Sequence, residues 1–142
     1  MSINYGTIVA YSHVAGTFAP ALAPLFLGSV CWTIYYDSIY AYQDRLDDIT
    51  AGVKSTALAW QGSGKKYLTG FSGSAIALWT LAGYMTGLGT GFYVGMLGIS
   101  SNFIYQISTV DLEDPQDCWN KFSSAKYTGL FLLASIILGK QF

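Results

Sequence analysis

Charged side chains are scarce in this chain, and long stretches lack them altogether. They make up 11% of the 142 residues, against about 25% in an ordinary soluble domain. Residues 1–36 and 67–110 contain none. A bilayer imposes such segregation, because a charged residue at the centre of a spanning helix costs roughly 2.5 to 3.5 kcal/mol on insertion scales. The composition therefore indicates a membrane protein.

The sequence also has few of the residues on which several other functions depend. It has no basic patch, and a net charge of −1 does not suit a phosphate backbone, so nucleic acid is excluded as a partner. Its two cysteines do not make a disulfide framework. A single histidine, His13, and a single glutamate, Glu113, are too few for a zinc site or a carboxylate-bridged di-iron site.

What the chain does have is five apolar segments that are candidates for spanning helices. A span needs about 20 residues to cross roughly 30 Å of hydrocarbon. The segments cover approximately residues 2–18, 21–43, 67–86, 92–110 and 122–140. We therefore expect an all-α, polytopic membrane helix bundle.

The order of these segments predicts that both charged windows lie on one side of the membrane. The windows are residues 37–66 and 111–126, and the two helices between them form a hairpin that returns the chain to the same face. Six of the seven Lys and Arg residues lie in these windows. The positive-inside rule then places this face in the cytoplasm or in the mitochondrial matrix.

Aspartates are concentrated in the segment YDSIYAYQDRLDDITAGVKST, residues 36–56. On a continuous helix with about 100° per residue, Asp37, Asp44 and Asp48 share one stripe, whereas Asp47 points roughly 80° away. Carboxylates this close repel one another and need a cation among them. Mg²⁺ is suited to the site, because it prefers oxygen ligands and is usually held by one or two carboxylates plus a substrate phosphate. A solvated acidic helix end is the alternative interpretation.

Two basic residues in the same segment fit phosphate chemistry. Lys54 follows the last aspartate in GVKST and would supply a point charge to a phosphate, and Arg45 lies next to Asp44. The segment is therefore a candidate site for a metal ion and a phosphorylated substrate.

This segment resembles the second aspartate-rich motif of the UbiA superfamily of intramembrane aromatic prenyltransferases, Y-D-x-x-x-A-x-x-D-x-x-x-D followed by G-x-K-S-T. Each fixed position is filled, and the matching residues are Tyr36, Asp37, Ala41, Asp44, Asp48, Gly52, Lys54, Ser55 and Thr56. Together with the later DPQDCWNKF, residues 114–122, the segment is similar to the 4-hydroxybenzoate polyprenyltransferase branch of ubiquinone biosynthesis. The resemblance covers nearly the whole chain.

The resemblance implies a nine-helix bundle, of which this chain would supply about five spans. It implies that Mg²⁺ bridges the diphosphate of a polyprenyl donor, and that the ring of 4-hydroxybenzoate attacks the allylic cation that forms. The residues carried over as catalytic are three carboxylates and a lysine, namely Asp37, Asp44, Asp48 and Lys54. The three carboxylates would hold the metal. Arg45 and Lys54 would bind the diphosphate, and Tyr40 would line an apolar wall.

The same resemblance gives expectations for location and completeness. We expect an integral protein of the mitochondrial inner membrane, surrounded by membrane lipid, with its site facing the matrix, or one of a bacterial inner membrane with its site facing the cytoplasm. The N-terminus resembles neither a signal peptide nor a transit peptide. The family's first aspartate-rich motif, N-D-x-x-D-x-x-x-D, is not in this sequence. Residues 1–142 are therefore expected to be a single domain, the C-terminal portion of a UbiA-type enzyme.

Two alternative functions stay open at this point. The chain could belong to another aromatic prenyltransferase of the family, with homogentisate, haem, chlorophyllide or naphthoate as the acceptor. It could also be a truncated membrane fragment without catalytic activity, because half of the expected metal site is missing from it. A soluble acidic metal-binding module is contradicted by the apolar segments.

Overall fold

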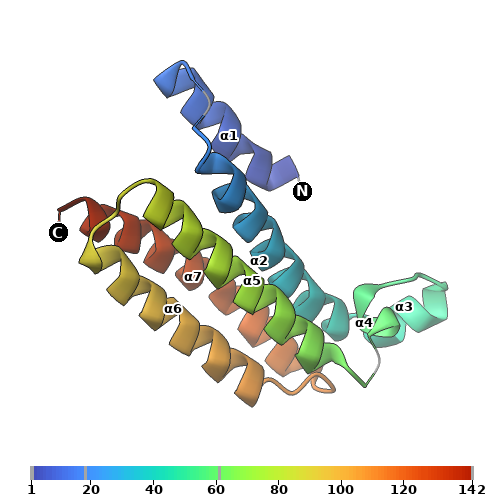
Figure 1. The fold of residues 1–142 in the computed structure, drawn as a ribbon. Coiled ribbons are helices and arrows are strands. Elements are labelled where there is room, and N and C mark those ends of the chain that lie inside the picture. The colour runs from blue at the N-terminus through green and yellow to red at the C-terminus, as the bar shows by residue number, and fades with distance from the viewer. Residues whose placement is uncertain (1, 18, 61, 142) are drawn as a thin grey trace.

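The computed structural model describes residues 2–17, 19–60 and 62–141, and all regular structure in these ranges is helical (Figure 1). The long helices are α1 (Ser2–Ala15), α2 (Leu22–Gln43), α5 (Gly64–Met85), α6 (Thr90–Thr109) and α7 (Pro115–Gln141). Two short helices, α3 (Arg45–Ala51) and α4 (Thr56–Ala59), connect α2 to α5. The prediction of an all-α fold is confirmed.

Helices form at all five predicted positions, but their hydropathy differs. By length and composition, α7 is the one helix in the described ranges that is long and apolar enough to cross a membrane. The helices α2, α5 and α6 contain 22, 22 and 20 residues, and about 20 residues suffice for a span. Many of their positions hold uncharged Tyr, Ser, Thr and Gly.

Four long helices form the bundle, and α1 extends from one end of it (Figure 1). Helix α2 packs against α5 and α7, α6 packs against α7 and α5, and α1 contacts α2. The short helices α3 and α4 lie at the opposite end of α2 from α1 (Figure 1). The acidic segment is therefore placed at one end of the bundle.

Large side chains fill the centre of the bundle. Its most deeply buried members are Tyr35, Ile39, Leu68, Trp79, Phe92 and Ile99. One polar network crosses this core: the Tyr35 hydroxyl donates to Gln106 Oε1 at 3.0 Å, and Gln106 Nε2 donates to Asn102 Oδ1 at 2.8 Å and to Ser124 Oγ at 3.2 Å. The network joins α2, α6 and α7, and because Gln106 is hydrogen-bonded through both ends of its amide, its burial is compensated.

The interface between α6 and α7 is too close for larger side chains. A Cβ at Gly91 would lie 2.9 Å from the Leu138 carbonyl oxygen, and a Cβ at Gly139 would lie 2.6 Å from Phe92 Cβ. A Cβ at Gly95 would overlap Ser135 Oγ. Small residues that let two helices approach in this way are common in membranes.

The outer faces of α6 and α7 are apolar and exposed. Their exposed large side chains include Val94, Leu97, Ile104, Leu130, Phe131 and Leu133. An apolar surface of this extent is unfavourable in water and is suited to contact with hydrocarbon.

Candidate functional site

The predicted stripe of aspartates requires one continuous helix, but the acidic segment is divided between two helices. Helix α2 ends at Gln43, Asp44 adopts φ −94° and ψ 8°, and α3 begins at Arg45. Figure 1 shows that α3 leaves the line of α2 at this point. The Asp48 N–H still donates to the Asp44 carbonyl at 2.9 Å. Asp44 and Asp48 therefore stay one turn apart, whereas Asp37 belongs to a different helix from Asp48.

The three predicted metal ligands are not gathered into one ligand set. Asp37 is exposed on α2, while Asp44 and Asp48 are half-buried. In the described ranges, no group of three or more His, Cys, Asp or Glu side chains is close enough to hold a metal ion. The donor type suits Mg²⁺, which needs only one or two protein carboxylates when a phosphate supplies further oxygens. The assignment of these residues as metal ligands stays a prediction.

Tyr40 lies on α2, one helical turn before Asp44. Its hydroxyl interacts with the Asp44 carboxylate, and its ring packs on Phe122 of α7 with 5.0 Å between ring centroids. The side chain is 38% exposed. Tyr40 is therefore partly exposed beside Asp44, with its ring supported by Phe122.

An aromatic row continues from Tyr40 along α2. Trp32, Tyr36 and Tyr40 follow one another at four-residue spacing, and Tyr36 lies 5.3 Å from Trp32 and 5.9 Å from Phe122 between ring centroids. Trp119 also packs on Phe122, at 5.9 Å. The four-residue spacing is visible in the sequence, but the contribution of Phe122 and Trp119 from α7 is not. The aromatic side chains around Tyr40 thus come from two helices, and their role as a wall for the substrate stays a prediction.

Lys54 follows a tight turn at the end of α3. Gly52 has φ +69°, its N–H donates to the Ile49 carbonyl at 3.3 Å, and the Val53 N–H donates to the Asp48 carbonyl at 3.0 Å. This left-handed cap at a glycine ends the helix and reverses the chain. The turn links the backbone of Asp48 to Val53, the residue before Lys54. The side chain of Lys54 is exposed.

Arg45 joins the two charged windows. Its Nη1 lies 2.9 Å from Oε1 of Glu113, in the turn between α6 and α7. The prediction that both windows meet at one end of the bundle is therefore confirmed. Sequence reasoning missed Glu113 as a neighbour of the site, because no local pattern connects residues 68 positions apart.

The aspartates of the second window bond to their own backbone. Asp111 Oδ1 accepts the Glu113 N–H at 2.9 Å, Asp114 Oδ1 accepts the Gln116 N–H at 2.9 Å, and Asp117 Oδ2 accepts the Asp111 N–H at 2.8 Å. These acids build the turn before α7. In contrast, the Asp47 and Asp48 carboxylates have no hydrogen-bond or ion-pair partner in the part of the chain that the structure describes.

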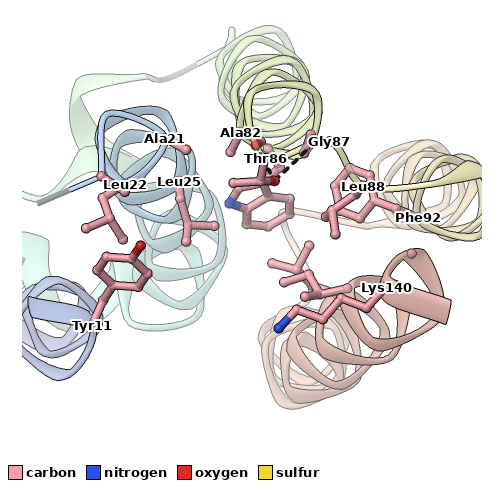
Figure 2. Close-up of a pocket in the computed structure, with 16 residues that line it drawn as sticks. Tyr11, Ala21, Leu22, Leu25, Ala82, Thr86, Gly87, Leu88, Phe92 and Lys140 are labelled. Atoms are coloured by element: carbon pink, nitrogen blue, oxygen red, sulfur yellow. Dashed lines mark hydrogen bonds between the residues drawn. The ribbon is translucent and has the colours of Figure 1, made fainter. Parts of the chain in front are cut away.

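The cavities of the bundle lie away from the acidic segment. One of about 410 Å³ opens at the opposite end, between α1, α2, the α5–α6 turn and the end of α7 (Figure 2). Its walls are mostly apolar, and Lys140 is the charged residue among them. A second, of about 510 Å³, lies between α5 and α6 with Lys65 at its edge. Neither of these two cavities is lined by Asp37, Asp44 or Asp48.

The fold is thus an apolar helical bundle with an acidic and basic segment at one end. Residues 2–136 match the UbiA prenyltransferase family, and the chain belongs to this family. Its fold is that of a helical membrane family. No solved structure matches the chain.

Individual relatives agree with this assignment. A protein of Arabidopsis thaliana named "4-hydroxybenzoate polyprenyltransferase, mitochondrial" is 40% identical over 143 residues, which cover 100% of this chain and 35% of that relative. A mouse protein of the same name is 38% identical, over 98% of this chain and 37% of its own length. "4-hydroxybenzoate geranyltransferase 2" of Lithospermum erythrorhizon is 38% identical, over 99% and 46%. The chain thus spans less than half the length of these relatives.

Proposed function

We propose that this chain is the part of an aromatic prenyltransferase that binds the diphosphate of a polyprenyl donor and promotes transfer of the prenyl group to the ring of 4-hydroxybenzoate. The observation that carries the proposal is the cluster between residues 44 and 54. It places two carboxylates, Asp44 and Asp48, with two cations, Arg45 and Lys54, at one end of the bundle. The printed names of the relatives supply the substrate class.

The contacts of these residues support the proposal. Asp48 is half-buried and unpartnered in the described ranges, so its oxygens are available to a ligand. Carboxylate oxygens are the ligands that Mg²⁺ prefers, and one or two of them suffice when a phosphate supplies further oxygens. The arrangement therefore favours a ligand that brings positive charge to the aspartates.

Mg²⁺ is the proposed cofactor, with Asp37, Asp44 and Asp48 as its protein ligands. When bound, it would neutralise charge on the diphosphate and so make it a better leaving group. Lys54 and Arg45 would add positive charge to the same phosphates, Lys54 as a point charge and Arg45 through its planar set of N–H donors.

The reaction itself breaks one bond and forms another. The carbon–oxygen bond between C1 of the prenyl chain and the diphosphate breaks, and diphosphate leaves with the electron pair. The ring carbon ortho to the phenol hydroxyl then bonds to C1, and the ring loses a proton. The aromatic row of Trp32, Tyr36 and Tyr40 would exclude water from the allylic cation, which water would otherwise capture.

The proposed location follows from the relatives and from the distribution of charge. Relatives named as mitochondrial and the family's membrane fold favour the mitochondrial inner membrane and a role in ubiquinone biosynthesis. The basic residues of both windows favour a site that faces the matrix. In a bacterial protein, the same charges would favour the cytoplasmic face of the inner membrane.

A second candidate differs in the donor. Two relatives at 37% and 38% identity are named 4-hydroxybenzoate geranyltransferases, so a short donor with the same acceptor is also compatible with this chain. Both candidates use the same diphosphate site. They differ in the length of the apolar chain that the aromatic row would cover.

The test is a prenylation assay of a full-length enzyme that contains this chain. Purified protein would be given 4-hydroxybenzoate with geranyl, farnesyl or longer polyprenyl diphosphates, with Mg²⁺ or with a chelator. We expect prenylated 4-hydroxybenzoate only when the metal is present. If homogentisate or naphthoate is prenylated and 4-hydroxybenzoate is not, the proposed acceptor is wrong and the enzyme uses another aromatic acceptor.

A second arm tests residues 1–142 by themselves. The chain would be assayed alone and together with a separately expressed N-terminal half that carries N-D-x-x-D-x-x-x-D. We expect activity from the pair and none from the chain alone, because the second group of carboxylates is supplied by the partner half. Absence of activity in every arm, the full-length enzyme included, would support the non-catalytic alternative.

A further inference from the structure

The turn between α6 and α7 has a defined shape that is set by its own acids. Asp111 Oδ1 accepts the Glu113 N–H, and the Asp111 N–H is in turn donated to Asp117 Oδ2. The buried Cys118 lies beneath the turn, with Sγ 3.5 Å from the Asp111 carbonyl oxygen. The backbone of Glu113 is therefore held in place, and its side chain projects from a fixed position.

Glu113 contacts the guanidinium of Arg45 through one atom pair. Oε1 lies 2.9 Å from Nη1, and the side chains of Arg45 and Glu113 are 25% and 73% exposed. A guanidinium carries five N–H donors in a rigid plane. Contact at one edge therefore leaves the remaining donors of Arg45 available to a second anion.

Without Glu113, Arg45 would have a competing partner in its own helix. Asp48 is three residues further along α3, and side chains at this spacing are neighbours on a helix surface. The Asp48 carboxylate has no partner in the described residues. An unrestrained Arg45 would pair with Asp48, and this pairing would occupy both a cation and a carboxylate of the proposed site.

We propose that Glu113 is a positioning residue that keeps Arg45 away from Asp48 and directs its free N–H donors to the diphosphate of the donor substrate. This inference rests on the proposed function, and it deepens it by assigning a role to the α6–α7 turn. Glu113 itself touches neither the substrate nor the reacting atoms.

The direction in which the KM for polyprenyl diphosphate changes on loss of Glu113 distinguishes a positioning role from a simple effect of its charge. Removing a negative charge near an anionic substrate ordinarily improves binding. Loss of Glu113 is expected to weaken it instead, because Arg45 loses its position. In a full-length enzyme, Glu113→Gln should raise the KM for polyprenyl diphosphate about threefold to fivefold, the effect of one exposed ion pair, while kcat stays within about twofold of the wild type. The inhibition constant of inorganic pyrophosphate should rise by the same factor.

Asp47→Asn is the matched control, because it removes one negative charge from the same end of the bundle without a contact to Arg45. It should leave both constants unchanged or lower them slightly. In an Arg45→Gln background, Glu113→Gln should have no further effect. The inference is overturned if Glu113→Gln lowers both constants as the control does, or if its effect persists without Arg45. A wild-type enzyme that neither prenylates 4-hydroxybenzoate nor binds pyrophosphate would refute the proposed function instead.

Discussion

The two acidic windows of the chain are similar in composition and differ in how their oxygens are used. In the window that begins at Asp111, three aspartates accept backbone N–H groups of the α6–α7 turn. In the window that begins at Asp37, Asp47 and Asp48 have no hydrogen-bond or ion-pair partner within the described parts of the chain. The three aspartates of residues 111–117 stabilise a turn, whereas the Asp48 carboxylate is available to a ligand.

This difference separates acids that already stabilise the fold from acids that are proposed to bind a ligand. A carboxylate that accepts backbone N–H groups stabilises the local fold and is already satisfied. The Asp48 carboxylate accepts no such N–H within the described residues, so its oxygens are available to a ligand. Substitutions of Asp44 or Asp48 should therefore affect activity, whereas substitutions of the turn acids in residues 111–117 should affect stability.

The largest effect is expected from Asp44→Asn in a full-length enzyme. The amide keeps the size of the side chain but loses the charge that a metal ion requires, so the prenylation rate should fall by about 100-fold or more. The melting temperature of the detergent-solubilised protein should stay the same. Asp47→Asn is the control with the same chemical change, and it should retain activity. Full activity of Asp44→Asn would remove Asp44 from the proposed site.

Asp114→Ala should show the opposite pattern. Asp114 precedes Pro115 at the start of α7, and its Oδ1 accepts the Gln116 N–H, as an N-terminal helix cap does. Loss of such a cap costs about 1 kcal/mol and at most about 2. Thermal unfolding should show the loss, while the prenylation rate stays within about twofold. A large loss of activity at unchanged stability would erase the distinction between the windows.

Gly52→Ala should act locally on the first window. The left-handed φ of +69° at Gly52 costs a residue with a Cβ about 1 kcal/mol. Because α3 has few contacts with the bundle, we expect faster hydrogen exchange in residues 45–54 and little change in global unfolding. Gly87→Ala is a comparison at another glycine of positive φ, at the far end of α5. It should leave exchange in residues 45–54 unchanged.

The smallest effect on activity is expected from single-cysteine substitutions, which serve to show on which side of the membrane a residue lies. With Cys31 and Cys118 replaced by serine, single cysteines at positions 47 and 114 should react with a membrane-impermeant thiol reagent from the same side. Arg45 and Glu113, next to these positions, are in contact. Labelling from opposite sides would contradict the arrangement of the two windows.

The sequence predicted the helices and the segment of the site better than it predicted the geometry of the site. The apolar segments located the helices because charge is excluded from them. The interruption at Asp44 was not predictable, since the spacing of Asp37, Asp44 and Asp48 is compatible with one helix. The contact of Arg45 with Glu113 depends on how distant helices pack. Helix α7 starts at Pro115, earlier than the predicted residue 122. Asp114 and Pro115 are a local signal for this start, but both precede the apolar segment that gives the predicted span.

The close interface of α6 and α7 has a mechanical consequence. Gly91, Gly95 and Gly139 leave no room between the two backbones, so neither helix can slide along the other without steric overlap. We therefore expect the hairpin to move as one unit, so that a displacement at its Gly139 end is passed on to Glu113 at the other end. We expect larger motion in the segment from Arg45 to Lys54, because α3 has few contacts with the bundle.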